Sequence, residues 1–310
     1  MRDPSLLAIS LLSVSVNLPE LPELWQPDFW MSPLFSLSDR DANPLQNTAI
    51  AAATEIVPDE GAFPEFSPVS VEKTSKVAQS PIAPKSGAQL YGQRLAALKS
   101  GQLYTRLLPE SFIEIWQKAI AQPTHQQWKT LLSRESQAIA GGQGSNHLNI
   151  LVGDSLSMWF PSHLLPRNRF WLNQGISGEN SGQIRDRLHF FAQTRPSKIY
   201  VMAGTNDLRQ GKSDIIILNN IQAIVRRLKQ NHPQGEIVVQ SILPTRNAAI
   251  SNDRIRRLNR NIAAIAYREG SVFLDVHSVL ADNRGELRSE LTTDGIHLSD
   301  RGYEVWRSLL

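Results

Sequence analysis

The sequence predicts an α/β fold with a five-stranded parallel sheet that is covered by helices on both faces. Beyond residue 147, short and almost wholly apolar runs alternate with longer segments of helical periodicity. Such runs are typical of strands buried on both faces, and the alternation of strands with helices is typical of parallel sheets. The predicted strands are residues 148–152, 169–173, 198–203, 236–242 and 271–276.

The first segment in chain order, residues 1–30, contains an apolar run over residues 6–12. That run is shorter than the roughly 20 apolar residues of a membrane-spanning helix. Asp3 cancels the charge of Arg2, which is unfavourable for a signal peptide, whereas the small residues 13–15 suit signal cleavage. Two interpretations stay open: an export signal or membrane anchor, which implies association with the membrane or cell envelope, and a hydrophobic segment of a cytoplasmic protein.

The next two segments differ sharply in composition. Residues 31–88 are rich in Pro, Ser, Ala and acidic residues without periodicity, which predicts a flexible linker. Residues 89–146 predict a small helical subdomain, because Ser111 and Thr124 each begin a capping-box sequence that is followed by apolar residues at helical spacing. Gly141 is the expected stop of its last helix. We expect this subdomain to pack on the rest of the chain, with a contribution to a lid as the alternative.

Two further helices are clear among the strands. The segment 252–268 has an apolar face, and Asn252 or Asp253 is expected to cap it. A final helix is predicted from about Ser299 to Leu310. The residues that form the apolar face of segment 252–268 are Ile255, Leu258, Ile262 and Ile265.

Composition excludes several kinds of site. The chain of 310 residues contains no cysteine, so disulfides, thiolate catalysis and Cys-ligated zinc are excluded. It also lacks the His-Glu-x-x-His motif of metal hydrolases, and we expect neither a metal nor a cofactor.

Charge is distributed unevenly along the chain. Residues 1–85 hold 5 basic and 11 acidic residues, whereas residues 86–310 hold 27 basic and 18 acidic ones. A basic C-terminal region would suit anionic substrates, lipid headgroups or acidic polymers, but a solvated surface explains it more simply. No basic run is interleaved with stacking aromatic residues, so nucleic acid is not an expected partner.

Polar residues that can carry chemistry follow four of the predicted strands. Ser155 comes directly after the first strand, Gly178 follows the second and Asn206 the third, while Asp294 and His297 follow the fifth after a longer loop. The carboxyl ends of parallel strands meet at one edge of a sheet. We therefore expect these five residues to lie close together.

Together these residue types supply what ester hydrolysis without a metal needs. A serine hydroxyl is a weak nucleophile and requires a base, which His297 can provide. Asp294 precedes His297 by three residues and can orient its ring, with Asp275 as a rival carboxylate. The backbone N–H groups of Ser155 and Gly178 and the side-chain amide of Asn206 can stabilise an oxyanion.

Four short blocks of this sequence resemble those of the SGNH hydrolases, also called the GDSL lipase/acylhydrolase family. The resemblance covers about residues 147–310 and includes all four blocks in order. It implies a flavodoxin-like three-layer α/β/α sandwich in which Ser155 is the nucleophile, Gly178 and Asn206 complete the oxyanion hole, and Asp294 and His297 complete the triad. A further segment, residues 243–246, resembles the platelet-activating-factor acetylhydrolase branch. The four blocks are Gly153–Leu156, Gly175–Asn180, Gly204–Asp207 and Asp294–Leu298.

The resemblance leaves the substrate open. The leading hypothesis is a serine esterase that cleaves small or lipid acyl esters through an acyl-enzyme. The first alternative is a carbohydrate O-acetylesterase that acts on polysaccharide or cell-wall sugars, and the second is a retired hydrolase that serves as a binding module. Trp159 is the best candidate for a substrate pocket because it follows the nucleophile closely, whereas Phe170 and Trp171 fit either a pocket or the sheet core.

Overall fold

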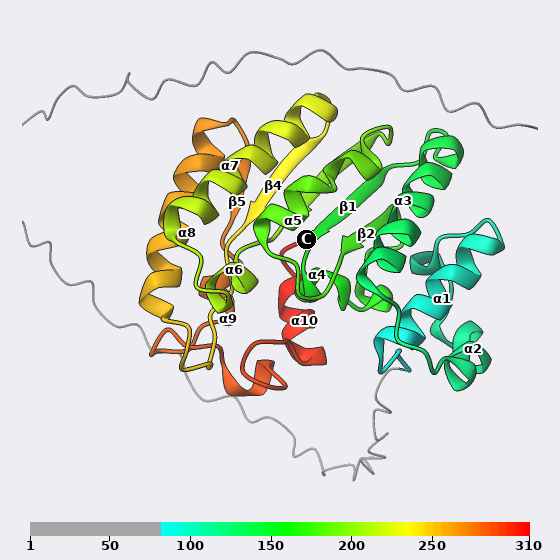
Figure 1. Ribbon diagram of the computed structural model, residues 1–310, viewed down its shortest axis with the longest axis horizontal. Helices are drawn as coiled ribbons and strands as arrows, with labels where there is room; N and C mark the ends of the chain where they lie inside the picture. The colour runs from blue at the N-terminus through cyan, green and yellow to red at the C-terminus, as the bar shows by residue number, and fades with distance from the viewer. Residues whose placement is uncertain (1–81) are drawn as a thin grey trace, which may run out of the picture. The chain divides into compact units, whose positions relative to one another are not determined.

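The computed structural model describes residues 82–310. Its centre is a sheet of five parallel strands in the order β2-β1-β3-β4-β5 (Figure 1). This is the strand order of flavodoxin-like folds, so the predicted α/β fold with a five-stranded parallel sheet is confirmed. The predicted signal or anchor segment and most of the predicted linker lie outside the described residues. The strands are β1 (Leu148–Gly153), β2 (Phe170–Gly175), β3 (Pro196–Val201), β4 (Glu236–Gln240) and β5 (Val272–Leu274).

Each face of the sheet is covered by its own helices, because alternate side chains of a strand point to opposite faces. Ile150 and Val152 of β1 lie in one hydrophobic core, and Leu151 between them lies in a second. The helices of the first core are α3 (His125–Gly142), α5 (Ser181–Asp186), α7 (Asp214–Asn231) and α8 (Asn252–Arg268), and Leu208 of the short helix α6 (Thr205–Arg209) joins them. Those of the second core are α4 (Ser155–Met158), α9 (Val276–Leu280) and α10 (Asp300–Arg307).

The remaining helices are short or lie beside these layers. In Figure 1, α1 and α2 lie beyond the β2 edge of the sheet. Within residues 82–310, no helix has both the length and the apolar character needed to cross a membrane. The further helices are α1 (Gly87–Lys99) and α2 (Ile113–Lys118), and single 3₁₀ turns occur at Tyr104–Arg106, Pro109–Phe112, Ser162–Leu164, Leu188–Phe191 and Ser289–Leu291.

The N-terminal helices share a third hydrophobic core with the sheet region. Met158 at the end of α4 and Ile176 after β2 pack among apolar residues of α1, α2 and α3. Arg94 of α1 is fully buried, forms an ion pair with Glu135 of α3, and donates a hydrogen bond of 2.7 Å to the carbonyl of Asn173 in β2. These contacts connect α1 and α3 to β2.

Two helix starts were predicted from capping boxes, and one of them is wrong. Thr124 caps α3 as predicted, because its hydroxyl accepts the N–H of Gln127 at 3.2 Å and the Gln127 side chain accepts the N–H of Thr124. Ser111 caps nothing, because a 3₁₀ turn over Pro109–Phe112 leads directly into α2.

The other differences lie at element ends. Ser251, rather than Asn252 or Asp253, caps α8 by accepting the N–H of Arg254 at 3.3 Å. Strand β5 is shorter than the predicted 271–276, because Asp275 leaves the sheet and caps α9.

Candidate active site

Ser155 is the first residue of α4, immediately beyond β1. Asp154 forms the turn between strand and helix, and its carboxyl accepts the N–H of Leu156 at 3.0 Å. The Ser155 hydroxyl lies 3.0 Å from His297 Nε2, although the two residues are 142 positions apart in the sequence. The structure thus brings the candidate nucleophile within hydrogen-bond distance of the candidate base, as serine chemistry requires.

Asp294 orients the ring of His297. Its Oδ2 lies 2.6 Å from His297 Nδ1, while its Oδ1 accepts the backbone N–H groups of Ile296 and His297 at 2.9 and 2.7 Å. Partial burial opposes ionisation of this carboxyl, but the hydrogen bonds from the His297 ring and from the two N–H groups outweigh it and lower the pKa of Asp294 to about 2. A carboxylate at Nδ1 favours the tautomer with the proton there, which leaves Nε2 free to accept the serine proton.

The loop that carries Asp294 and His297 is fixed by residues that sequence reasoning did not single out. Thr292 donates to the carbonyl of His297 at 2.6 Å and accepts the N–H of Gly295 at 2.8 Å. The carbonyl of Gly295 in turn accepts bonds from the Thr245 hydroxyl at 2.9 Å and the Arg246 N–H at 2.8 Å. Thr245 and Arg246 belong to the segment 243–246, whose sequence indicates a family resemblance but not this contact with the loop.

The candidate oxyanion donors are the N–H groups of Ser155 and Gly178 and the side-chain amide of Asn206. Asn206 is hydrogen-bonded to Asp154 and Glu179, the chain neighbours of the other two. Gly178 has φ +82°, a conformation that favours glycine. Within residues 82–310, the N–H groups of Ser155 and Gly178 donate to no protein acceptor. Asn206 links the two loops, since its Nδ2 donates to the carbonyl of Glu179 at 3.0 Å and lies 3.3 Å from Asp154 Oδ2. Both amide protons therefore have acceptors, and the longer bond, to Asp154, is the one that an oxyanion would replace.

A buried ion pair supports the Gly178 loop, and no pattern in the sequence predicts it. Glu179 and Arg187 are both almost fully buried, and the guanidinium Nε lies 2.5 Å from Glu179 Oε2. Arg187 also donates to the carbonyl of Gly153 at 2.9 Å, and His125 of α3 contacts the other carboxylate oxygen at 2.8 Å. The pair therefore connects the end of β1 with the loop after β2.

Other candidate residues have structural roles. Asp275 accepts the N–H of Ser278 at 3.2 Å within α9 and is not a hydrogen-bond partner of His297. Asp207 accepts the N–H and hydroxyl of Ser181 at 2.7 and 2.6 Å. Trp171 belongs to the second core and Phe170 packs against the first, so both are sheet-core residues.

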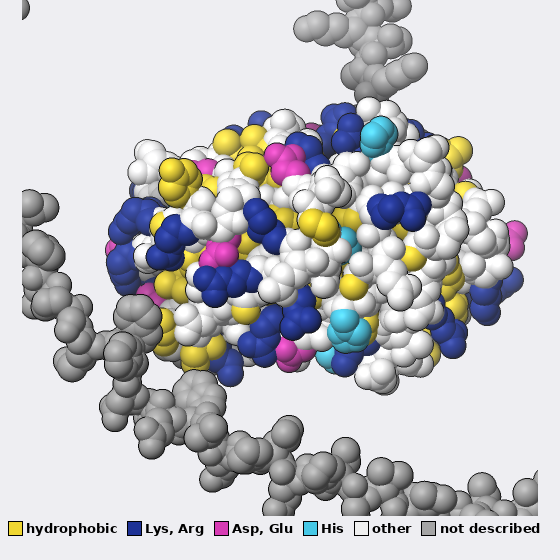
Figure 2. Space-filling model, turned by 90° about the horizontal axis from the view of Figure 1, so that it is seen from above, with side chains coloured by type: hydrophobic (Ala, Val, Ile, Leu, Met, Phe, Trp, Pro, Cys, Tyr) yellow, Lys and Arg dark blue, Asp and Glu magenta, His cyan; other side chains and the backbone are white. Residues whose placement is uncertain are grey.

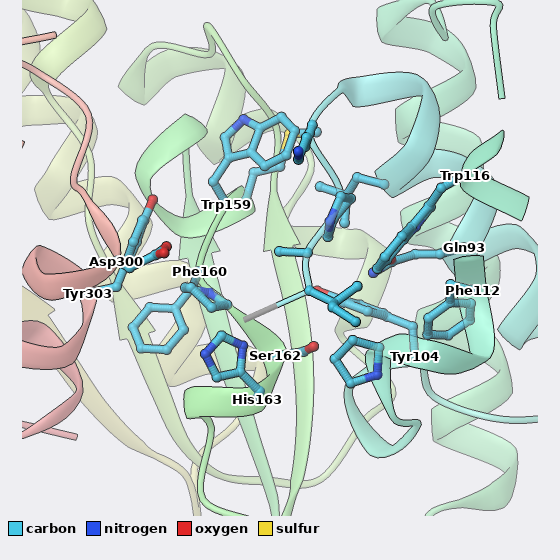
Figure 3. A pocket seen from close by; sticks show the side chains of 18 of the residues that line it. Gln93, Tyr104, Phe112, Trp116, Trp159, Phe160, Ser162, His163, Asp300 and Tyr303 are labelled. Atoms are coloured by element: carbon cyan, nitrogen blue, oxygen red, sulfur yellow. The ribbon is translucent and has the colours of Figure 1, made fainter. Parts of the chain in front are cut away.

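A cleft of about 440 Å³ opens beside His297 (Figure 3). Trp159, the predicted pocket residue, lines it together with Phe160. The opposite wall comes from the N-terminal helices and includes Gln93 and Trp116. Further aromatic residues of the lining are Tyr104, Phe112 and Tyr303.

Comparison with known proteins identifies the family. A family model of GDSL-like lipases and acylhydrolases matches residues 139–305, which is more than half of the chain. This chain belongs to the GDSL-like lipase/acylhydrolase family. No curated protein sequence matches the chain significantly.

Two solved structures resemble more than half of the chain. A protein from Streptococcus pneumonia, provisionally described as a platelet activating factor, is 28% identical with a TM-score of 0.54, over 60% of this chain and 92% of that chain. A GDSL-like lipase from Bacteroides thetaiotaomicron is 20% identical with a TM-score of 0.51, over 58% of this chain and 94% of that chain. The second similarity shows a shared fold.

The GDSL-family match begins at residue 139, so α1, α2 and most of α3 lie outside it. One wall of the cleft therefore comes from a part of the chain that the family model does not cover.

On the face drawn in Figure 2, Lys and Arg side chains are scattered among uncharged ones. Within residues 82–310, no group of three or more His, Asp or Glu side chains could hold a metal ion.

Proposed function

We propose that this GDSL-family protein is a serine esterase that cleaves carboxylic esters through an acyl-enzyme. The Ser155 hydroxyl attacks the ester carbonyl carbon while His297 Nε2 takes its proton. The carbonyl π electrons move to the oxygen, where the N–H groups of Ser155 and Gly178 and the amide of Asn206 stabilise the negative charge. The tetrahedral intermediate then collapses, the alcohol leaves with the proton from His297, and the acyl group stays on Ser155.

Water completes the cycle by the same chemistry. His297 takes a proton from the water that attacks the acyl-enzyme, and it returns this proton to Ser155 as the acid departs. Asp294 stabilises the His297 imidazolium during both acylation and deacylation.

The observation that carries this proposal is the continuous hydrogen-bonded chain from Ser155 through His297 to Asp294, with distances of 3.0 and 2.6 Å. A retired hydrolase used as a binding module has no need of this hydrogen-bonded triad together with two oxyanion N–H groups that donate to no acceptor within residues 82–310. The esterase is therefore favoured over the binding module.

The test is hydrolysis of p-nitrophenyl acetate by the wild type and single variants. Ser155→Ala should lower kcat by about 10⁴-fold or more. Asn206→Ala should lower kcat by about 10²–10³-fold with a smaller effect on KM, since its amide acts mainly in the transition state.

Two carboxylates provide a matched control. Asp294→Asn should lower kcat by about 10²–10⁴-fold because the ring loses its orienting acceptor. Asp275→Asn should stay close to the wild type, since this residue only caps α9. Equal rates for the wild type and Ser155→Ala would refute the mechanism, and a larger loss in Asp275→Asn than in Asp294→Asn would refute the assignment of the carboxylate.

A further inference from the structure

The position of the cleft relative to the proposed mechanism indicates which part of the ester it holds. Among the residues of the proposed machinery, His297 lines the cleft, whereas Ser155, Gly178 and Asn206 do not. In serine ester hydrolysis, the histidine protonates the leaving alcohol, while the oxyanion donors hold the acyl carbonyl. The cleft therefore lies on the alcohol side of the scissile bond. This step rests on the proposed function.

The walls of the cleft suit a ring rather than a flexible chain. Trp159 and Phe160 lie on one side, and Trp116 and Phe112 project from the N-terminal helices on the other (Figure 3). Flat aromatic surfaces pack well against the C–H faces of a six-membered ring. A volume of about 440 Å³ lies in the usual range for small-molecule sites and accommodates such a ring with substituents.

Gln93 gives the cleft an NH₂ group that donates to no acceptor within residues 82–310. Its side chain is almost fully buried, and its Oε1 accepts the Trp116 indole N–H at 2.9 Å. That bond fixes the orientation of the amide, and within residues 82–310 its NH₂ group donates no hydrogen bond.

Unpaired polar groups in a cleft select against hydrocarbon ligands. A buried donor that faces an alkyl chain keeps its full desolvation cost, whereas a hydroxyl group of a ligand relieves it. The ligand that satisfies both the aromatic walls and the Gln93 NH₂ group is a ring that carries hydroxyl groups.

We propose that this cleft binds the alcohol part of the ester, and that Gln93 selects cyclic alcohols with further hydroxyl groups, such as the pyranose ring of an acylated sugar. The selecting residue lies in α1, outside the region that the family model matches. The specificity of this esterase is thus contributed by the helices that precede its GDSL-family domain.

The experiment compares two acetyl esters with alcohols of the same ring size. The substrates are a mono-acetylated methyl xylopyranoside and cyclohexyl acetate, which share the acyl group and differ in hydroxyl groups. The wild type should favour the sugar ester in kcat/KM by at least about tenfold. Gln93→Leu removes the donor and should bring the ratio of the two values close to one. Because a ratio is measured, a general loss of active protein does not affect the result.

Two controls accompany this variant. Gln93→Glu keeps an acceptor for the Trp116 indole but has no NH₂ group, and it should also lose the preference. Gln126→Leu makes the same change on the exposed surface of α3 and should keep the wild-type ratio.

The outcomes separate this proposal from the function on which it rests. A wild type that cleaves cyclohexyl acetate or decyl acetate as fast as the sugar ester, or a Gln93→Leu variant that keeps the preference, overturns the inference about the cleft. The esterase proposal survives those results as long as Ser155→Ala is inactive. An active Ser155→Ala variant overturns the esterase proposal itself.

Discussion

At the scale of single residues, Asp154 is a carboxyl group in an unusual environment. It is almost fully buried beside the candidate nucleophile, where it accepts the N–H of Leu156 at 3.0 Å and lies 3.3 Å from the Asn206 amide. Burial raises the pKa of Asp154 from 3.8 to about 6, although the Leu156 bond and the nearby His297 oppose the shift. The folded protein therefore holds this proton more tightly than the unfolded chain does.

That difference predicts how stability depends on pH. The stabilisation from the neutral carboxyl is fully present below the unfolded-state pKa of about 3.9 and is lost as the pH rises through about 6. The change from 3.8 to about 6 corresponds to about 3 kcal/mol. Relative to Asp154→Asn, the wild type should lose up to about this free energy of unfolding between pH 4 and pH 7. Urea unfolding of both proteins across this range measures the difference, and parallel pH profiles would show that the carboxyl is not perturbed.

At the scale of elements, the placement of Ser155 depends on how closely α4 packs on the end of β2. Gly175 lies at this contact, and a Cβ atom there would come within 2.3 Å of the Met158 N and 2.9 Å of the Asp154 carbonyl oxygen. These are backbone atoms of the helix that Ser155 begins, so they cannot move aside without moving the helix. Glycine at the end of β2 thus sets the position of the nucleophile.

Gly175→Ala should therefore impair both folding and catalysis. We expect a loss of about 1–3 kcal/mol in the free energy of unfolding, as for other overpacked sites. The displaced α4 should also lower kcat/KM for p-nitrophenyl acetate by at least about tenfold, because small misplacements of reacting groups are costly. Gly141→Ala in α3 is the matched control, since its Cβ would meet no atom within 4 Å. Equal behaviour of the two variants would contradict this account.

At the scale of the whole molecule, the N-terminal helices and the sheet form one packed structure. Arg94, Glu135 and Asn173 come from α1, α3 and β2, and all three are buried. The guanidinium donates to both carboxylate oxygens of Glu135, at 3.0 and 2.5 Å, and to the Asn173 carbonyl at 2.7 Å. Removing the negative partner would leave a buried charge without compensation.

Glu135→Gln should consequently destabilise the whole of this structure. We expect a loss of about 3–5 kcal/mol in the free energy of unfolding. Circular dichroism and tryptophan fluorescence should report the same single transition, because helices and sheet share the third core. Asp186→Asn, which removes the exposed ion pair with Arg185, should change stability by less than about 1 kcal/mol. Two separate transitions would show that the helices fold independently.

The fold class and the order of the chemical groups along the chain follow from the amino-acid sequence alone. Buried parallel strands are read from local apolar runs, and the carboxyl ends of such strands meet at one edge. For this reason Ser155, Gly178, Asn206 and His297 could be assigned to one site before any distance was known. Asp294 could be preferred over Asp275 because only Asp294 is three residues from His297.

The contacts that hold these groups in place, and the residues that lie beside them, become visible only in the folded protein. The Glu179–Arg187 pair, the bonds from Thr245 and Arg246 to the Gly295 carbonyl, and the cleft wall that contains Gln93 all join residues far apart in the sequence. Local periodicity carries no information about such partners, because they depend on how separate elements pack. The same reason explains the Ser111 prediction, since its local capping pattern was correct in form but was overridden by the turn at Pro109.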